Sequence, residues 1–427
     1  MLDIRTIREH PESVLDSLKK RNQEEKAPLV KEAQEKDKEW RKTKGELDEL
    51  RHKRNRVSED INKAKKEGKD ASKLMAEAKS IPGKLKELED REEQLRTRII
   101  EILRTLPNLL DPEVPEGKDA SQNVAREELG KKTELGFPAR SHVELCEQLG
   151  IADFEASRRT SGHGFFFLKG DLALLDQALQ RYALDMMLQE GFTPIVPPYM
   201  IRKEIVDGVV DLHFFEEIIY KLEGEDLYPI STSEHPLIGM MEGQDIPVNE
   251  LPVKLCGISP CFRKELGAHG IDEKGLFRTH QFNKIEQVVI CKPEESREWY
   301  EKLLGITKKI FTGLGIPTRV WESCAGDLGD LKARGADLEA WSPRRKEYFE
   351  VASVSNLTDA QARRLRIKML YPDGTREYAH TLNNTALATS RAMVAIIENY
   401  QQKDGTVKVP FVLVPYMGGK KVIKSVS

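Results

Sequence analysis

Two seams of mostly apolar residues, spaced alternately three and four apart, constrain the N-terminal part of this 427-residue chain. Such spacing places the side chains of each seam on one helical face, as in a coiled coil. The turn-forming run Gly68-Lys69-Asp70 separates the seams. The pattern predicts two helices of roughly 35 residues, each about 50 Å long, folded back as an antiparallel hairpin. The seams are Leu47, Leu50, Arg54, Val57, Ile61 and Ala64, then Leu74, Ala78, Ile81, Leu85, Leu88, Glu92, Leu95, Ile99 and Ile102.

The tip half of this hairpin is basic. One interpretation is the solvated surface that most charge runs form, and the other is a rod that follows phosphates. The residues alone do not separate the two. The basic residues are Arg51, Lys53, Arg54, Arg56, Lys63, Lys65 and Lys66.

Composition excludes several classes of protein. The 68 basic and 71 acidic residues give a net charge of −3, so any contact with nucleic acid must come from a local patch. No apolar run approaches the ~18 residues of a membrane span, and we expect no secretory signal in the charged N-terminus. The five cysteines are scattered without a CxxC pair, which favours free thiols, a cytoplasmic location and no structural zinc.

The remaining pattern predicts a helical hairpin over residues 1–110, a Pro- and Gly-rich linker over 111–140 and a mixed domain over 141–427. Helices are expected over 171–190 and 294–314, and strands over 253–262, 278–291 and 407–414. Strands without strict βαβ alternation favour an α+β fold with an antiparallel sheet flanked by helices. Neither a P-loop nor a GxGxxG motif follows a strand.

The densest chemical signal spans residues 261–287. Arg263 ends one expected strand, and Glu265 shares its face if the chain stays extended. Arg278 opens the next strand, and Phe282 shares its face. Guanidinium groups bind phosphate and an aromatic ring stacks on a base, so the hairpin suits a nucleotide. A surface hairpin with ordinary ion pairs is the equally weighted alternative.

A second signal lies in residues 379–401, where a short strand leads into a helix that presents Arg391. A helix start beside a guanidinium is a candidate phosphate site. A capped amphipathic helix, with Asn384 or Thr385 as the cap, fits the same residues.

Three further segments are weak when taken singly. Glu350 and Ser353 lie on a strand-like run and have oxygen ligands suited to Mg²⁺. The triplet Thr232-Ser233-Glu234 resembles a helix cap, and residues 190–200 resemble a helix exit followed by an edge strand.

Taken together, these five segments resemble the motifs of the class II aminoacyl-tRNA synthetases, most closely the seryl-tRNA synthetase family. Residues 190–198 are similar to motif 1, which builds the dimer interface in that family. Residues 262–282 resemble motif 2, and residues 383–391 resemble motif 3. Asn384, Ala386 and Ser390 stand where bacterial members carry glycines, a feature shared with archaeal and eukaryotic members.

The resemblance implies an ATP site. Arg263 would bind the α-phosphate and the serine carboxylate, Glu265 the adenine amino group, and Phe282 one adenine face. Arg391 would cover the other face and reach the γ-phosphate, and Glu350 with Ser353 would carry Mg²⁺. The full implied ATP set is Arg263, Lys264, Glu265, Arg278, Thr279, Phe282, Glu350, Val351, Ala352, Ser353 and Arg391.

The resemblance also implies a serine site, in which Glu286 and Thr385 would receive the amino and hydroxyl groups of serine. The implied serine set is Thr232, Ser233, Glu234, Arg263, Glu286, Asn383 and Thr385.

The activity implied is ATP-dependent formation of seryl-adenylate, followed by transfer of serine to the 3′ end of tRNA(Ser), with charging of tRNA(Sec) left open. The hairpin would be the tRNA-binding arm, and the enzyme a homodimer without a membrane segment. The alternatives are a related ligase that loads a carrier protein and a non-catalytic coiled-coil adaptor. The arm argues against the first, and the arginines of motifs 2 and 3 argue against the second.

Overall fold

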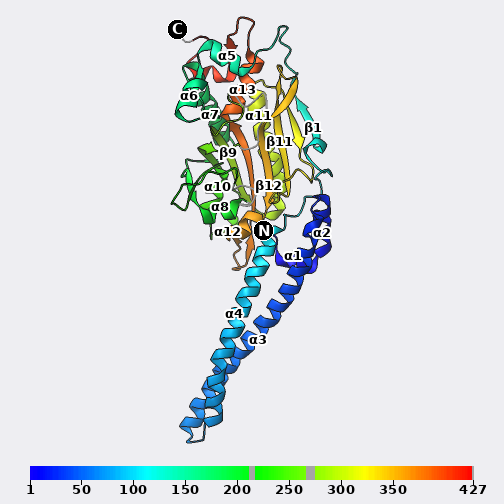
Figure 1. The fold of residues 1–427 in the computed structure, drawn as a ribbon, viewed down its shortest axis with the longest axis vertical. Helices are drawn as coiled ribbons and strands as arrows, with labels where there is room; N and C mark the ends of the chain where they lie inside the picture. Colours follow the sequence, from blue (N-terminus) through cyan, green and yellow to red (C-terminus); the bar gives the residue numbers. More distant parts are fainter. Residues whose placement is uncertain (211–216, 266–274, 426–427) are drawn as a thin grey trace. The chain divides into compact units, whose positions relative to one another are not determined.

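The computed structural model of the chain describes residues 1–210, 217–265 and 275–425 (Figure 1). The chain falls into two compact units, Met1–Leu109 and Leu110–Ser427. Gly267 and Gly270, in the loop expected between the motif 2 strands, lie outside the described residues.

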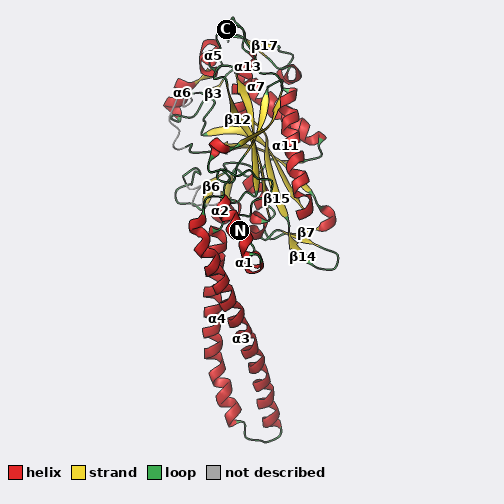
Figure 2. Ribbon diagram, turned by 90° about the vertical axis from the view of Figure 1, so that its right-hand side faces the viewer, coloured by secondary structure: helices red, strands yellow, loops and turns green. Residues whose placement is uncertain are grey.

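The first unit is entirely helical, and its two longest helices form the expected antiparallel hairpin (Figure 2). Gly68, in the left-handed region with φ +67°, lies in the turn between these helices. Its helices are α1 (Ile4–Glu9), α2 (Pro11–Lys20), the 3-10 turn η1 (Glu24–Lys26), α3 (Ala27–Lys66) and α4 (Ser72–Thr105).

The predicted seams form two separate cores in this unit. Towards the turn, Leu47 and Val57 of α3 pack against Ile81 and Leu85 of α4. At the other end, α1 and α2 cover the hairpin with apolar side chains, and Arg8 binds the buried carboxylate of Asp37 through two 2.8 Å hydrogen bonds. The coiled-coil prediction is therefore confirmed, although the seam residue Arg54 is exposed.

The second unit is built on an eight-stranded sheet that is antiparallel except where β4 pairs with β8. The α+β prediction is therefore confirmed. In spatial order the strands are β1 (Val124–Leu129), β10 (Thr318–Glu322), β11 (Arg334–Ser342), β12 (Glu347–Thr358), β15 (His380–Ala388), β9 (Gln281–Cys291), β8 (Val253–Phe262) and β4 (Thr193–Ile195).

Helices cover both faces of this sheet. Side chains alternate along β9, so Val289 joins the core beneath α7, α11 and α13, whereas Val288 joins the core beneath α8, α10 and α12. The helices of this unit are α5 (His142–Leu149), α6 (Phe154–Thr160), α7 (Asp171–Gln189), α8 (Lys203–Val209), α10 (Glu234–Gly239), α11 (Ser296–Gly313), α12 (Ala360–Leu365) and α13 (Thr389–Tyr400).

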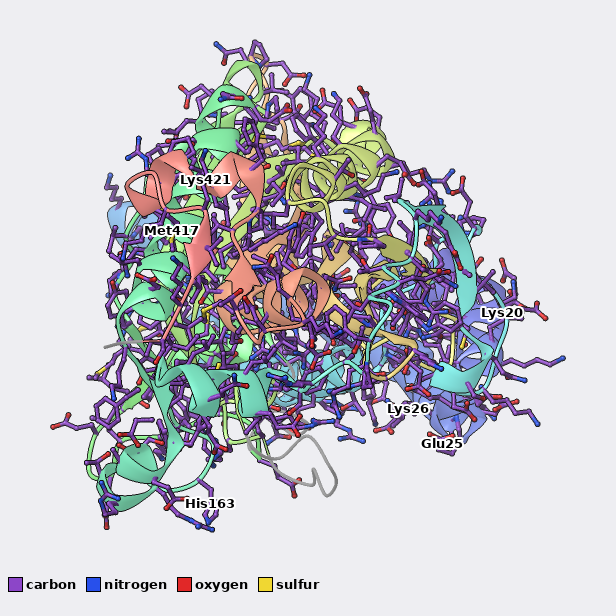
Figure 3. The ribbon with its side chains drawn as sticks, turned by 90° about the horizontal axis from the view of Figure 1, so that it is seen from above. Lys20, Glu25, Lys26, His163, Met417 and Lys421 are labelled. Carbon is purple, nitrogen blue, oxygen red and sulfur yellow. The ribbon has the colours of Figure 1, made fainter. Side chains whose placement is uncertain are left out.

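Short elements complete the second unit. The 3-10 turn η6 (Pro415–Met417) packs on α7, where Tyr416 donates a 2.9 Å hydrogen bond to Asp185. Figure 3 labels Met417 of this turn and Lys421, which follows it. The short strands are β2 (Ala152–Asp153), β3 (Phe167–Leu168), β5 (Met200–Arg202), β6 (Leu227–Pro229), β7 (Asp245–Pro247), β13 (Lys368–Leu370), β14 (Arg376–Tyr378), β16 (Val407–Lys408) and β17 (Val422–Ile423). The 3-10 turns are η2 (Ala120–Gln122), η3 (Val248–Glu250), η4 (Pro293–Glu295), η5 (Phe411–Leu413) and η6 (Pro415–Met417).

Several expected boundaries differ from the structure. Within the segment 111–140, expected as a linker, β1 pairs with β10 at the sheet edge. The strand expected over 407–414 stops at Lys408, because Pro410 lacks the N–H that a ladder needs, and a 3-10 turn follows. Among the described residues, no helix has the length and apolar character needed to cross a bilayer.

Candidate active site

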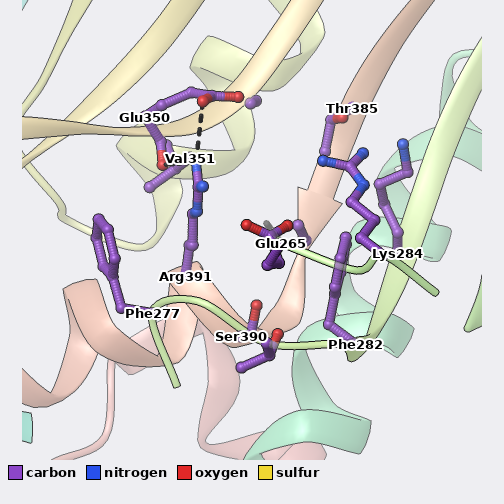
Figure 4. Close-up of a pocket in the computed structure, with 13 residues that line it drawn as sticks. Glu265, Phe277, Phe282, Lys284, Glu350, Val351, Thr385, Ser390 and Arg391 are labelled. Atoms are coloured by element: carbon purple, nitrogen blue, oxygen red, sulfur yellow. Dashed lines mark hydrogen bonds and ion pairs between the residues drawn. The ribbon is translucent and has the colours of Figure 1, made fainter. Parts of the chain in front are cut away.

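One cavity gathers side chains from β9, β12, β15 and α13, and from the segments that follow β8 and precede β9 (Figure 4). It brings together nine of the predicted site residues: Arg263, Glu265, Thr279, Phe282, Glu350, Val351, Ala352, Thr385 and Arg391. Four further lining residues, which the sequence did not single out as site residues, are Phe277, Lys284, Ala388 and Ser390.

Each of the two arginines in the cavity lies against an aromatic ring. The Arg263 guanidinium is 5.3 Å from the ring centre of Phe282, and its Nε donates to the carbonyl oxygen of Ser231 at 3.2 Å. The Arg391 guanidinium lies 5.3 Å from the ring centre of Phe277. Flat cationic groups held beside aromatic rings can stack on a base or neutralise phosphate.

Glu350 fixes Arg391 within the cavity. Arg391 Nη1 donates to both the carbonyl oxygen and Oε2 of Glu350, each at 3.0 Å. Figure 4 shows the two side chains facing each other across the cavity wall, joined by a dashed line. Burial alone would raise the pKa of Glu350, but the Arg391 charge and hydrogen bond outweigh it, so the pKa lies below its ordinary value. The Glu350 carboxylate is therefore ionised at neutral pH.

A buried ion pair lies at one side of the cavity. Lys284 Nζ is 2.6 Å from Oε2 of Glu286 and donates to Oγ1 of Thr232 at 2.7 Å. The same Thr232 oxygen accepts the amide N–H of Glu234 at 3.2 Å. Thr385 Oγ1 lies 3.4 Å from Glu286 Oε2, which links the predicted serine-site residues to the cavity.

The carboxyl group of Glu234 has a raised pKa. Burial, and secondly the negative charge of Glu286, raise its pKa to about 7, despite the 2.7 Å hydrogen bond that Gln361 Nε2 donates to its carboxylate. Perturbed carboxyl groups of this kind are typical of functional sites.

Asp337, on β11, carries a buried carboxyl group that does not line the cavity. It lies opposite Ser353 in the β11–β12 register, and burial together with the charge of Glu350 raises its pKa to about 7. In the described part of the chain, no group of three or more His, Cys, Asp or Glu side chains is arranged to hold a metal ion. The oxygen donors of Glu350 and Ser353 suit Mg²⁺ that is held jointly with phosphates.

The remaining predicted residues do not line the cavity. The Lys264 amide donates to the carbonyl of Ile218 at 2.8 Å, and Arg278 Nη1 lies 3.8 Å from Glu265 Oε2. Asn383 lies on β15 beside β12 and β9 and is almost fully buried. Ser233 precedes α10 and is fully buried.

Three local expectations require correction. Glu265 is not extended, because its φ of +47° lies in the left-handed region. Arg278 does not open a strand, since β9 begins at Gln281. Neither Asn384 nor Thr385 caps the helix: β15 continues through both residues, and α13 begins at Thr389 without a side-chain cap.

The basic residues of the hairpin fall into two groups. Arg51 lies 2.9 Å from Glu89, and Lys53 lies 2.5 Å from Glu77, so both are paired across the hairpin. In contrast, the other five form no ion pair within 4.0 Å in the described structure, and all are exposed: Arg54, Arg56, Lys63, Lys65 and Lys66.

Comparison with known proteins covers both units. Residues 1–110 match the seryl-tRNA synthetase N-terminal domain, and residues 218–400 match the tRNA synthetase class II core domain (G, H, P, S and T). The serine–tRNA ligase of Methanocella arvoryzae is 49% identical over 421 residues, covering 98% of this chain and 99% of that protein.

Solved structures agree over the full length. Seryl-tRNA synthetase from Pyrococcus horikoshii complexed with ATP has a TM-score of 0.94 and 44% identity, with 100% of both chains covered. Cytoplasmic serine–tRNA ligase from Naegleria fowleri in complex with AMP has a TM-score of 0.90 and 33% identity, covering 100% of this chain and 99% of that chain. The chain therefore belongs to the seryl-tRNA synthetase family of class II aminoacyl-tRNA synthetases.

Proposed function

We propose that this protein is a serine–tRNA ligase, which activates L-serine with ATP and transfers it to the 3′ end of tRNA(Ser). The observation that carries the proposal is the convergence of Arg263, Phe282 and Arg391 on one cavity, within a chain that matches serine–tRNA ligases along its length. The relatives crystallised with ATP and AMP support the choice of nucleotide.

In the first step, the serine carboxylate attacks the α-phosphorus of ATP and pyrophosphate leaves. The attacking carboxylate is already ionised at neutral pH, so the reaction requires no general base. The barrier falls because the reactants are held in line and their negative charges are neutralised. Arg263 and Arg391 carry the two guanidiniums for this purpose.

The nucleotide would lie between Phe282 and Arg391, with Glu265 receiving the adenine amino group. All three residues line the same cavity. Arg263 would bind the α-phosphate while its ring contact with Phe282 holds the guanidinium in place. Lys264, Arg278, Thr279, Val351 and Ala352 complete the proposed ATP site.

Glu350 and Ser353 would hold Mg²⁺ together with the ATP phosphates, and the ion would supply further neutralisation of phosphate charge. Glu350 is ionised and lies at the cavity, and Ser353 adds a hydroxyl oxygen three residues along the same strand. Both are the hard oxygen ligands that Mg²⁺ prefers.

Serine would bind where Thr232, Glu286 and Thr385 meet, bordered by Ser233, Glu234 and Asn383. Lys284 neutralises part of the charge of Glu286. The hydroxyl of serine would complete hydrogen bonds that alanine and glycine leave unmade. Each buried polar group left unpaired costs about 1–3 kcal/mol, which gives selectivity against those amino acids.

In the second step, the terminal ribose hydroxyl of tRNA attacks the carbonyl of seryl-adenylate and releases AMP. The N-terminal hairpin is the proposed tRNA-binding arm, whose exposed cations would contact phosphates rather than read base sequence. The proposed compartment is the cytoplasm, because the substrate is tRNA.

The proposed assembly is a homodimer formed through the motif 1 region. β4 is an edge strand of the large sheet, and the segment that follows exposes Val196, Tyr199 and Met200 by 66%, 41% and 47%. Exposed apolar side chains beside a sheet edge are typical of an interaction surface.

Aminoacylation with labelled serine tests the proposed function. Purified protein, ATP and Mg²⁺ should load serine onto a tRNA(Ser) transcript. Alanine and threonine should not be loaded onto this tRNA, and serine should not be loaded onto a phosphopantetheinylated carrier protein. Loading of the carrier instead of tRNA would replace the proposal with the related ligase. The arm, which matches the seryl-tRNA synthetase N-terminal domain, argues against that alternative.

A further inference from the structure

His280 lies where the ladder between β8 and β9 ends. The last regular pair is Phe262 with Gln281, so the next antiparallel pair would be Arg263 with His280. The Arg263 amide N–H donates to the His280 carbonyl oxygen at 2.9 Å, as that pairing requires.

The return hydrogen bond of this pair is not made by the main chain. The His280 amide N–H donates instead to the carbonyl oxygen of Gly164 at 2.8 Å. The carbonyl oxygen of Arg263 is bound by the His280 side chain, whose Nδ1 lies 2.8 Å away. A carbonyl oxygen can only accept, so Nδ1 carries the proton and donates it. The imidazole therefore takes the place of a main-chain donor.

Neighbouring groups hold the His280 ring in this orientation. Its ring centre lies 5.2 Å from that of Phe165 and 6.3 Å from that of Tyr220. Gly164 has φ +75°, and a Cβ at that position would approach His280 Cδ2 within 2.4 Å. Only glycine leaves room for the ring there. The nearby side chain of His163 points away from the body of the molecule (Figure 3).

Fixing the main chain at Arg263 matters because the chain turns immediately afterwards. Lys264 is tied to Ile218 through its amide, and Glu265 is left-handed. Both main-chain polar groups of Arg263 are thus held by His280, while its guanidinium reaches Ser231 and Phe282.

We infer that His280 is a positioning residue for nucleotide binding: through Nδ1 it fixes the backbone of Arg263 and thereby aims the guanidinium at the α-phosphate. This inference rests on the proposed function, because it assigns Arg263 to ATP. His280 itself is absent from the residues that line the cavity.

The test measures ATP affinity by calorimetry for His280→Ala, His280→Asn and His280→Gln, with thermal unfolding of each variant. Asparagine places an N–H donor near the position of Nδ1, whereas glutamine places it near that of Nε2. Loss of one hydrogen bond and the resulting misplacement of Arg263 should weaken ATP binding roughly tenfold in the alanine and glutamine variants. The asparagine variant should bind ATP nearly as well as the wild type. The thermal unfolding midpoints of the three variants should not rank in the same order as their ATP affinities.

A double-mutant cycle shows whether His280 acts through Arg263. Arg263→Ala should weaken ATP binding, and adding His280→Ala to it should weaken binding no further. Additive losses would overturn the inference, as would wild-type affinity in His280→Ala or equal losses in all three His280 variants. Serine-dependent pyrophosphate exchange by the wild-type protein is measured first; its absence would refute the proposed function rather than the role of His280.

Discussion

One nitrogen of Arg391 binds two oxygens of Glu350, its carbonyl oxygen and its carboxylate Oε2, each at 3.0 Å. The pair joins the proposed γ-phosphate ligand to the proposed Mg²⁺ ligand across the β12–α13 side of the cavity. Bound ATP and Mg²⁺ would compete for this contact, because phosphates would attract the Arg391 guanidinium and the ion would attract the Glu350 carboxylate.

The first prediction concerns the carboxylate of this pair. Glu350→Gln removes a charged oxygen ligand but keeps the shape of the side chain, so the Mg²⁺ concentration that gives half-maximal pyrophosphate exchange should rise about tenfold. Glu347→Gln is the control, since Glu347 is an exposed residue on the same strand that does not line the cavity. An unchanged Mg²⁺ requirement in Glu350→Gln would exclude Glu350 as a ligand.

The second prediction concerns the buried pair Lys284–Glu286. Lys284→Met leaves the Glu286 charge without its partner in a buried site, which should lower the free energy of unfolding by about 3 kcal/mol. Adding Glu286→Gln should restore much of the stability, because no unpaired charge remains, but serine activation should stay impaired. Chemical denaturation and the KM for serine measure the two effects; full recovery of both in the double variant would refute the proposed role of Glu286.

The third prediction concerns pH and Glu234. Its folded pKa of about 7 lies above the ordinary value of 4.5, so the folded protein binds an extra proton between these values. This contribution to stability is complete below about pH 4.5 and is lost as the pH rises towards 7. Glu234→Gln removes this dependence of stability on pH. The free energy of unfolding of the variant, relative to that of the wild type, should therefore rise by about 1–2 kcal/mol between pH 4.5 and 8. The effect is limited to this size because part of the Glu234 side chain is exposed. Denaturation curves that differ by a constant amount over this range would contradict the assignment.

The fourth prediction concerns the arm. Two double variants are compared, and each loses two positive charges. One replaces Lys63 and Lys65 with glutamine, and the other replaces Arg51 and Lys53 with glutamine. Within the described residues, Arg51 and Lys53 are engaged by the carboxylates of Glu89 and Glu77, whereas Lys63 and Lys65 form no such ion pair. The double variant of Lys63 and Lys65 should therefore weaken tRNA binding more, and reduce the slope of log affinity against log salt by about 1–2.

Pyrophosphate exchange provides the control for the arm variants, because it requires no tRNA. It should be unchanged in both double variants. Equal effects of the two double variants on tRNA binding would show that total charge, rather than these particular cations, determines the affinity.

The sequence predicted the elements in which periodicity and composition agree. The 3-4 seams gave the hairpin, and the range expected for the first motif 2 strand coincides with β8. β1 escaped prediction because residues 124–129 are nearly all exposed and have no buried face to impose alternation. The strand expected over 407–414 was wrong because Pro410 interrupts the apolar run and cannot donate to a strand ladder.

The site residues that were missed depend on register or on turns. Lys284 alternates with Phe282 and Glu286 on β9, so the period-2 rule could have placed it on the same face. Asp337 does not line the cavity, and its place beside Ser353 arises only from pairing across two strands, which a single sequence does not contain. Phe277 reaches the cavity from a segment that precedes β9, where neither helical nor strand periodicity applies.

Serine-dependent ATP–pyrophosphate exchange, measured for the wild type and Arg263→Ala over a panel of amino acids, tests the central claim most directly. The wild type should exchange with serine far faster than with alanine, glycine or threonine, and Arg263→Ala should lose exchange by at least about a hundredfold. Exchange driven by a different amino acid, or near-wild-type exchange by Arg263→Ala, would contradict the account.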